Sequence, residues 1–262
     1  MSKTFKKGAV MKRLTQYVLL AVLAVAVSGI VLVAQQAPTD DQLLEAFDKA
    51  RFVESPSFTM TVEVVADRPD GTKQAVVQLY FKEIEGRRYA RIEFLSPEEL
   101  KGQVYLSTPD GVFFWQPGLA TPLKVSGRQP VFGDSSVSET VGIQFKGDYK
   151  VKARKDVTLP GNKAGLEVEL EATEKSVAFQ KVTVTADKAT LRPVKARLFA
   201  LSGDPLNDVT YQEYATLDKD EYVKKQLIEN QLIKTNKTLL TITKIEAKDL
   251  PNDLFDPNKL GK

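Results

Sequence analysis

The chain has 262 residues, a formal net charge of +3, and neither histidine nor cysteine. Without these residues it cannot form a Ser-His-Asp or Cys-His catalytic arrangement, a disulfide or a histidine-ligated zinc site. It also has no lipobox cysteine and is therefore not itself a lipoprotein. No Ser-x-x-Lys sequence follows residue 34. We therefore predict a protein that is not an enzyme and that uses no cofactor and no metal.

The N-terminus has the composition of an export segment. The first 34 residues contain five basic side chains and no acidic one, and residues 17–34 form an apolar stretch. A basic flank before an apolar run is typical of an export signal. The run just reaches the length that spans a bilayer, and neither Ala24-Val25-Ala26 nor Leu32-Val33-Ala34 is a good cleavage site. We predict that residues 1–34 are an export signal or an N-terminal membrane anchor.

The remaining chain, residues 35–262, is predicted to be one β domain outside the cytoplasm. It is periplasmic and soluble if the leader is cleaved, and otherwise anchored to the inner membrane by residues 17–34. Loss of the five basic residues leaves a net charge of about −2, which gives no support to nucleic-acid binding.

A helix is predicted first. Thr39 and Gln42 have the spacing of a capping box. Leu43, Leu44 and Phe47 then recur at helical spacing and form one apolar stripe. Such a helix either closes a core or acts as a lid over a cavity, and the sequence leaves both alternatives open.

Short segments with period-2 alternation follow, separated by Gly- and Pro-containing turns. They predict a mainly β fold with about ten or eleven antiparallel strands. The clearest segments are 58–64, 77–81, 89–95, 104–106, 112–116, 166–170, 182–184, 194–201, 209–214 and 239–247.

Three other segments break this rhythm. Residues 117–147 are rich in Gly, Pro and Ser and predict a long loop with a short strand or helix inside. Residues 218–235 are charged and predict a second helix. Within them Asp218, Asp220 and Glu229 have the spacing of a calcium loop, but Val223 stands where that loop needs glycine, so we predict no calcium site. Residues 249–260 predict a short C-terminal turn.

Adjacent aromatic residues stand out at Phe113, Phe114 and Trp115. Neighbouring residues on a strand point to opposite faces, so one face is core and the other is covered by another element or by a ligand. Phe113 and Trp115 share a face and are predicted to line a cavity.

The order of these features resembles the outer-membrane lipoprotein-sorting protein family, which is related to the LolA and LolB carriers. The resemblance rests on Leu43-Leu44, the segments 94–106 and 112–117, the Gly133-Asp134-Ser135-Ser136 segment, and the pairs Leu250-Pro251 and Leu254-Phe255. It implies a single strongly curved antiparallel sheet, an unclosed half-barrel, with helices covering its concave face. It also implies that this face binds acyl chains, with an inner-membrane transporter or an outer-membrane acceptor as partner.

We predict a non-catalytic cell-envelope protein that shields the acyl chains of a lipid or lipoprotein during transport or sorting toward the outer membrane. The alternative is a membrane-anchored lipid-sensing or protein-interaction module of the same fold. The lid helix would present Leu43, Leu44 and Phe47. The predicted cavity residues are Val62, Val64, Leu79, Phe81, Ile92, Phe94, Val104, Leu106, Phe113 and Trp115. A one-residue error in register would move any strand's set to the opposite face.

Overall fold

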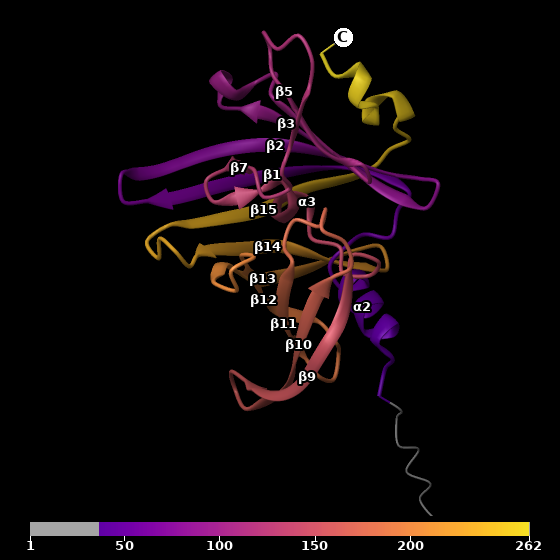
Figure 1. Ribbon diagram of the computed structural model, residues 1–262, viewed down its shortest axis with the longest axis vertical. Helices are drawn as coiled ribbons and strands as arrows, with labels where there is room; N and C mark the ends of the chain where they lie inside the picture. The colour runs from indigo at the N-terminus through magenta and orange to yellow at the C-terminus, as the bar shows by residue number, and fades with distance from the viewer. Residues whose placement is uncertain (1–36, 262) are drawn as a thin grey trace, which may run out of the picture. The chain divides into compact units, whose positions relative to one another are not determined.

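A single antiparallel sheet of thirteen strands dominates the computed structural model, which describes residues 37–261 (Figure 1). The spatial order of the strands is β6-β5-β4-β3-β2-β1-β15-β14-β13-β12-β11-β10-β9. Their bounds are β1 Ser57–Arg68, β2 Gly71–Ile84, β3 Arg87–Ser96, β4 Val104–Thr108, β5 Gly111–Trp115, β6 Leu123–Val125, β9 Tyr149–Leu159, β10 Lys163–Ala172, β11 Lys181–Asp187, β12 Pro193–Phe199, β13 Pro205–Leu217, β14 Asp220–Asn230 and β15 Lys237–Ala247.

The sheet consists of two meanders, β1–β6 and β9–β15, which join where β1 pairs with β15. The outermost strands, β6 and β9, are not paired with each other, so the sheet is not closed into a barrel. The connection between them contains a small second sheet of β7 (Pro130–Phe132) and β8 (Ser135–Ser136). The prediction of a mainly β chain with one unclosed antiparallel sheet is confirmed, with more strands than the ten or eleven expected.

The alternating strands fold as expected because their apolar residues meet directly across the ladder. Met60 lies opposite Leu79, and Val62 lies opposite Val77, and all four side chains are buried. Side chains directly opposite each other in an antiparallel pair share one face. The polar residues between them therefore lie together on the other face.

The helix predicted over 218–235 is wrong. Residues Asp220–Asn230 form β14, which pairs with β13 on one side and β15 on the other. Its Lys, Gln and Glu side chains favour a helix in isolation, but that preference is a few tenths of a kcal/mol per residue and two ladders of hydrogen bonds override it. Asp218 adopts a left-handed φ of 54° in the turn before β14, so the chain reverses instead of starting a helix.

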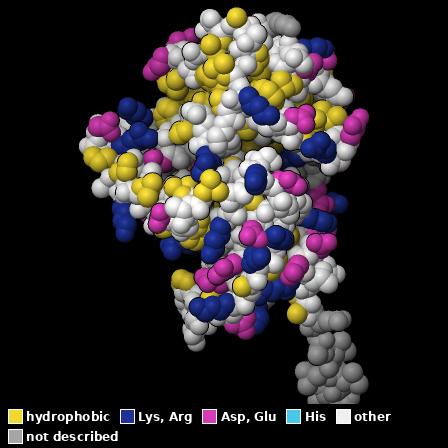
Figure 2. Space-filling view, viewed as in Figure 1, with side chains coloured by type: hydrophobic (Ala, Val, Ile, Leu, Met, Phe, Trp, Pro, Cys, Tyr) yellow, Lys and Arg dark blue, Asp and Glu magenta, His cyan; other side chains and the backbone are white. Residues whose placement is uncertain are grey.

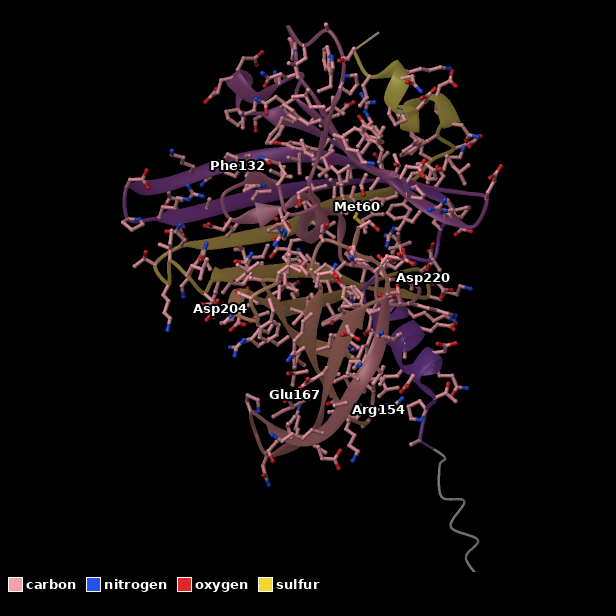
Figure 3. All side chains as sticks on the ribbon, viewed as in Figure 1. Met60, Phe132, Arg154, Glu167, Asp204 and Asp220 are labelled. Atoms are coloured by element: carbon pink, nitrogen blue, oxygen red, sulfur yellow. The ribbon has the colours of Figure 1, made fainter. Side chains whose placement is uncertain are left out.

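Strand β9 has no counterpart among the predicted strands because it carries little apolar alternation. It is an edge strand, and Lys150, Lys152 and Arg154 lie along it. Lysine on an edge strand discourages pairing with another chain. Arg154 and Glu167 lie near this end of the sheet, whereas Met60 lies in its middle (Figure 3). Figure 2 shows basic and acidic side chains interspersed over the β9–β11 region.

Two helices and three short 3-10 segments complete the described chain. Helix α2 (Asp40–Lys49) begins at the capping box of Thr39 and Gln42, as the sequence predicts. Helix α3 (Val137–Val141) has its own capping box, formed by Ser136 and Glu139. The 3-10 segments are η1 (Glu98–Leu100), η2 (Asn252–Phe255) and η3 (Pro257–Lys259).

Buried apolar side chains gather in two clusters on opposite faces of the sheet. The inner cluster is the larger, and it contains the side chains of α2 and α3 together with one face of most strands. Its members include Leu43, Leu44, Phe47, Val62, Leu79, Phe81, Ile92, Phe94, Val137, Val168, Leu198 and Ile228. The outer cluster consists of Val104, Leu106, Leu250, Phe255 and Leu260, with Tyr80, Ile84, Tyr89, Phe113, Trp115 and Leu254 packed against them.

The predicted leader, residues 1–34, lies outside the described residues. Within residues 37–261 none of the helices has the length and apolar character needed to cross a bilayer.

Candidate functional site

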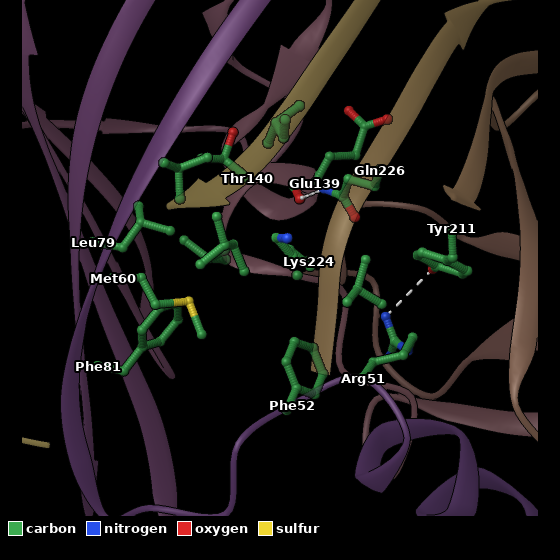
Figure 4. A pocket seen from close by; sticks show the side chains of 16 residues that line it. Arg51, Phe52, Met60, Leu79, Phe81, Glu139, Thr140, Tyr211, Lys224 and Gln226 are labelled. Carbon is green, nitrogen blue, oxygen red and sulfur yellow. Dashed lines mark hydrogen bonds between the residues drawn. The ribbon is translucent and has the colours of Figure 1, made fainter. Parts of the chain in front are cut away.

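A hollow of about 50 Å³ lies on the inner face, between β1, β2, β13–β15 and helix α3 (Figure 4). Seven apolar strand residues form its wall: Met60, Val62, Leu79, Phe81, Val223, Leu240 and Ile242. Polar groups reach it from Arg51, Glu139, Thr140, Tyr211, Lys224 and Gln226. Pockets that bind small ligands usually measure roughly 300–1,000 Å³. The hollow is therefore narrow in this structure and has room for little more than water.

Arg51, directly after α2, holds the segments around the hollow together. Its guanidinium donates to the main-chain oxygen of Phe47 at 3.1 Å and to that of Ile143 at 2.6 Å. It also donates to the Asp48 carboxylate at 2.8 Å and to the Tyr211 hydroxyl at 3.4 Å (Figure 4). The Arg51 side chain is only 3% exposed. A buried charge of this kind is tolerated because its donors are occupied and a carboxylate lies next to it.

Asp48 extends this network to the segment that follows α3. Its carboxylate accepts hydrogen bonds from the backbone N–H groups of Phe145, at 3.0 Å, and Lys146, at 2.8 Å. The ring of Phe47 packs edge-on against that of Phe145, with centroids 6.2 Å apart. Helix α2 is therefore joined to residues 143–146 by polar bonds as well as by apolar packing.

Glu139 is the second buried charge at the hollow. Its carboxylate accepts from the Ser136 backbone N–H at 3.0 Å, from the Ser136 hydroxyl at 2.6 Å and from the Asn207 amide at 2.8 Å. Its main-chain oxygen accepts from the Gln226 amide at 3.1 Å, which ties α3 to β14 (Figure 4). Burial raises the pKa of the Glu139 carboxyl, and the hydrogen bonds from Ser136 and Asn207 offset part of that rise.

This arrangement offers little chemistry beyond binding. Within residues 37–261 no three acidic side chains converge as metal ligands. The Ser136 hydroxyl lies against Glu139, but both residues are buried and serve as the cap of α3. An apolar wall with a few oriented polar groups is the usual composition of a site that holds an apolar ligand.

A family model described as "-like: Uncharacterized protein" matches residues 86–262. The chain belongs to that family. No curated protein matches it in sequence.

Solved structures identify the fold. A LolA superfamily protein from Nitrosomonas europaea matches with a TM-score of 0.76 and 23% identity, covering 84% of this chain and 98% of that chain. A putative outer membrane lipoprotein-sorting protein domain from Vibrio parahaemolyticus matches with a TM-score of 0.72 and 19% identity, covering 85% of this chain and 98% of that chain. A DUF1329 family protein from Desulfovibrio piger matches with a TM-score of 0.72 and 15% identity, covering 84% of this chain and 97% of that chain. The chain has the fold of the LolA superfamily, and the resemblance predicted from the sequence is confirmed for the fold.

The structure divides the ten predicted cavity residues between the two faces of this LolA-like sheet. Six of them belong to the inner cluster: Val62, Val64, Leu79, Phe81, Ile92 and Phe94. Of these, Val62, Leu79 and Phe81 line the hollow. The other four, Val104, Leu106, Phe113 and Trp115, belong to the outer cluster and lie under the C-terminal segment.

The ladder between β3 and β4 explains this division. Ile92 pairs with Tyr105, so Tyr105 shares the inner face with Ile92, and Leu106 points the other way. Leu106 pairs in turn with Phe113, and Val104 pairs with Trp115. Phe113 and Trp115 do share a face, as the sequence predicts, but it is the outer one. On these two strands the inner positions are taken by Tyr105, Val112 and Phe114.

The three predicted lid residues are buried among the strands' inner side chains. Leu43 and Phe47 are 0% exposed and Leu44 is 2% exposed. Among the polar residues at the hollow, Glu139 had a detectable sequence signal, since Ser136-x-x-Glu139 is a capping-box spacing. Arg51 and Tyr211 had none, because their contacts join segments about 90 to 160 residues apart.

Proposed function

We propose that this protein is a non-catalytic binding protein of the cell envelope that shields acyl chains of a lipid or lipoprotein on their way toward the outer membrane. The observation that carries the proposal is the apolar strand wall of the hollow in a LolA-like sheet. One of the similar structures is described as a putative outer membrane lipoprotein-sorting protein domain. Each methylene moved from water to such a wall contributes about 0.8 kcal/mol, so a long chain gains much from a modest surface.

Binding requires the hollow to open, because its volume is too small for an acyl chain. The parts of its lining that do not belong to strands are the Arg51-Phe52 segment and residues 139–142 at the end of α3. We propose that α2, through Leu43, Leu44 and Phe47, and α3 together form the lid over the concave face. Movement of α3 and the 143–146 segment would widen the hollow while the strands keep their register.

The cavity in this proposal is lined by fewer of the strand residues than the sequence predicts. It is lined by Val62, Leu79 and Phe81 in the closed state and extends toward Val64, Ile92 and Phe94 when open. Val104, Leu106, Phe113 and Trp115 are left out because the C-terminal segment covers them. Residues 35–262 form the binding domain, and residues 1–34 export it to the periplasm or anchor it to the inner membrane.

The test is native mass spectrometry with lipid extraction on protein purified from the envelope fraction. We expect an acyl lipid bound at near-stoichiometric level in the wild type. Ile242→Trp places an indole in the hollow and should remove that lipid. Ile245→Trp is the matched control, since Ile245 lies on the same strand in contact with the inner cluster but does not line the hollow. Equal lipid content in both variants, or none in the wild type, would contradict the proposal.

The alternative, an envelope interaction or sensor module, is favoured by the small volume of the hollow. In that case lipid is a signal or is absent, and an uncleaved leader anchors the domain. The intact mass from the same spectra separates the two functions. A mass that includes residues 1–34 together with an empty domain supports the module, whereas a cleaved, lipid-loaded domain supports the carrier.

A further inference from the structure

Arg88, the second residue of β3, lies at the rim of the hollow. It alternates with Ala90 and Ile92, so it belongs to the inner face of the strand. Its guanidinium carbon lies 4.0 Å from the ring centre of Phe52 and 4.8 Å from that of Phe81. Both rings line the hollow. The cation is therefore part of the hollow's aromatic edge.

The other charged groups at the hollow already have partners. Arg51 is paired with Asp48, Lys224 with Glu213 at 2.8 Å, and Glu139 accepts three hydrogen bonds. In the described part of the chain, by contrast, Arg88 has no ion pair. Glu83 lies directly across from it in the β2–β3 register, but that side chain is exposed and forms no ion pair with Arg88.

Arg88 is partly buried and remains a cation at neutral pH. Burial lowers the pKa of its guanidinium to about 10, with the nearby charge of Asp48 raising it and that of Arg51 lowering it. The two rings stabilise the face of the guanidinium, but they do not satisfy its N–H donors, which lie in its plane. Those donors match the two oxygens of a carboxylate or a phosphate.

The Phe52 ring marks where the tail of such a ligand would enter. It packs against Gly142 at the end of α3 so closely that a Cβ on Gly142 would lie 2.4 Å from it. It is also only partly buried, unlike Phe81 on the wall behind it. Outward rotation of this single ring would join the hollow to the rim at Arg88.

Building on the proposed function, we propose that the ligand is an anionic amphiphile whose carboxylate or phosphate head binds Arg88. Its acyl tail takes the place of the Phe52 ring and runs along Met60, Leu79 and Phe81. The site thus selects an acidic head group as well as an apolar chain. A neutral lipid of the same length makes only the apolar contacts.

The experiment compares the affinities of cis-parinaric acid and its methyl ester. The fluorescence of both probes rises when they enter an apolar site. For the wild-type domain we expect the acid to bind at least tenfold more tightly than the ester, which is a difference of about 1.4 kcal/mol. Arg88→Gln should remove that preference by weakening the acid alone. Arg88→Lys keeps the charge and should retain part of the preference. Arg87→Gln is the matched control, because Arg87 is exposed and adjacent on the strand.

Competition by dodecyl phosphate, dodecanoate and dodecanol then separates the two acidic heads from a neutral one. The inference is overturned if acid and ester bind the wild type equally, or if Arg88→Gln, folded by circular dichroism, keeps the preference. In both cases acyl binding itself stands. If neither probe binds and no lipid is extracted, the proposed function fails together with the inference.

Discussion

The two faces of strands β3–β5 are covered in different ways. On the outer face, Val104 and Leu106 are covered by the chain's own C-terminal segment through the apolar side chains of Leu250, Phe255 and Leu260. Arg91 and Lys82, on the strands beneath, donate hydrogen bonds to main-chain oxygens of that segment. On the inner face the covering elements also carry buried charges, Arg51 and Glu139, and enclose a hollow. An apolar contact loses free energy gradually as surface separates, whereas a hydrogen-bonded charge either has its partners or lacks them. Because the buried Arg51 of the inner cover would lose several hydrogen-bond partners at once, we expect that cover to have two discrete positions.

The largest effect is expected in the outer cluster. Phe255 is 2% exposed and packs edge-on against Tyr89, with ring centroids 6.3 Å apart. Phe255→Ala should lower the free energy of unfolding by about 3–5 kcal/mol, measured by urea denaturation. The folded fraction should still bind cis-parinaric acid with wild-type affinity. Leu123→Ala, at a side chain that is 49% exposed, is the control and should change stability by less than about 0.5 kcal/mol. Lost affinity in folded Phe255→Ala would join the outer cluster to the binding site.

The sequence alone predicts that Val104 and Leu106 line the cavity, whereas the structure places them in the outer cluster. The strand register explains the difference. Period-2 alternation predicted ten of the strands, and the spacing of Thr39 and Gln42 predicted the capping box of α2. Both signals depend only on residues close together in the chain. Whether Leu106 or Tyr105 faces inward depends on which residue of β3 lies opposite each of them. The sequence of residues 104–106 does not determine this register. The charged strand β14 was missed for a related reason, since only its two neighbours hold it extended.

The site itself was less predictable than the fold. The part of its apolar wall on β1 and β2 follows from alternation, so Val62, Leu79 and Phe81 were within reach of the sequence. Its polar groups depend on contacts across the molecule, such as that of Arg51 with Tyr211. No spacing rule joins residues 160 positions apart.

A second prediction concerns the inner cover, which consists of α2, α3 and residues 143–146. Arg51→Met removes the buried cation that bonds Phe47, Asp48, Ile143 and Tyr211. We expect a loss of about 3 kcal/mol in unfolding free energy, near the lower end for breaking a buried pair, because Asp48 keeps two backbone donors. Amide exchange at residues 143–146 should rise more than that of the strands. Arg192→Met, which removes a partly exposed pair with Glu221, should cost less than about 1 kcal/mol. Uniformly faster exchange in Arg51→Met would show that this cover has no motion of its own.

A smaller, pH-dependent effect is expected at Glu139. Burial raises the pKa of its carboxyl in the folded protein above the ordinary value of 4.5. The folded state therefore binds the proton more tightly than the unfolded state, and this contribution to stability is complete below about pH 4.5. It is lost as pH rises through the raised pKa. The stability of the wild type relative to Glu139→Gln should thus fall from pH 4.5 to pH 8, as followed by thermal unfolding.

Glu99→Gln provides the comparison for that titration, since Glu99 lies exposed in η1. A wild-type curve parallel to that of Glu139→Gln would mean that Glu139 is not desolvated in solution. The inner cover would then be open to water at α3.

The smallest effect is expected at the start of α2, and it separates two ways in which the inner cover can loosen. The Thr39 hydroxyl accepts from the Gln42 N–H at 3.2 Å, and the Gln42 side chain accepts from the Thr39 N–H at 3.0 Å. Thr39→Ala removes the first bond and should cost about 1 kcal/mol or less, whereas Thr39→Ser keeps it. Because Arg51 and Asp48 hold the other end of the helix, only the first turn should exchange faster. If exchange at residues 143–146 also rises in Thr39→Ala but not in Thr39→Ser, then α2 moves as one rigid body, and its cap helps to hold the hollow closed.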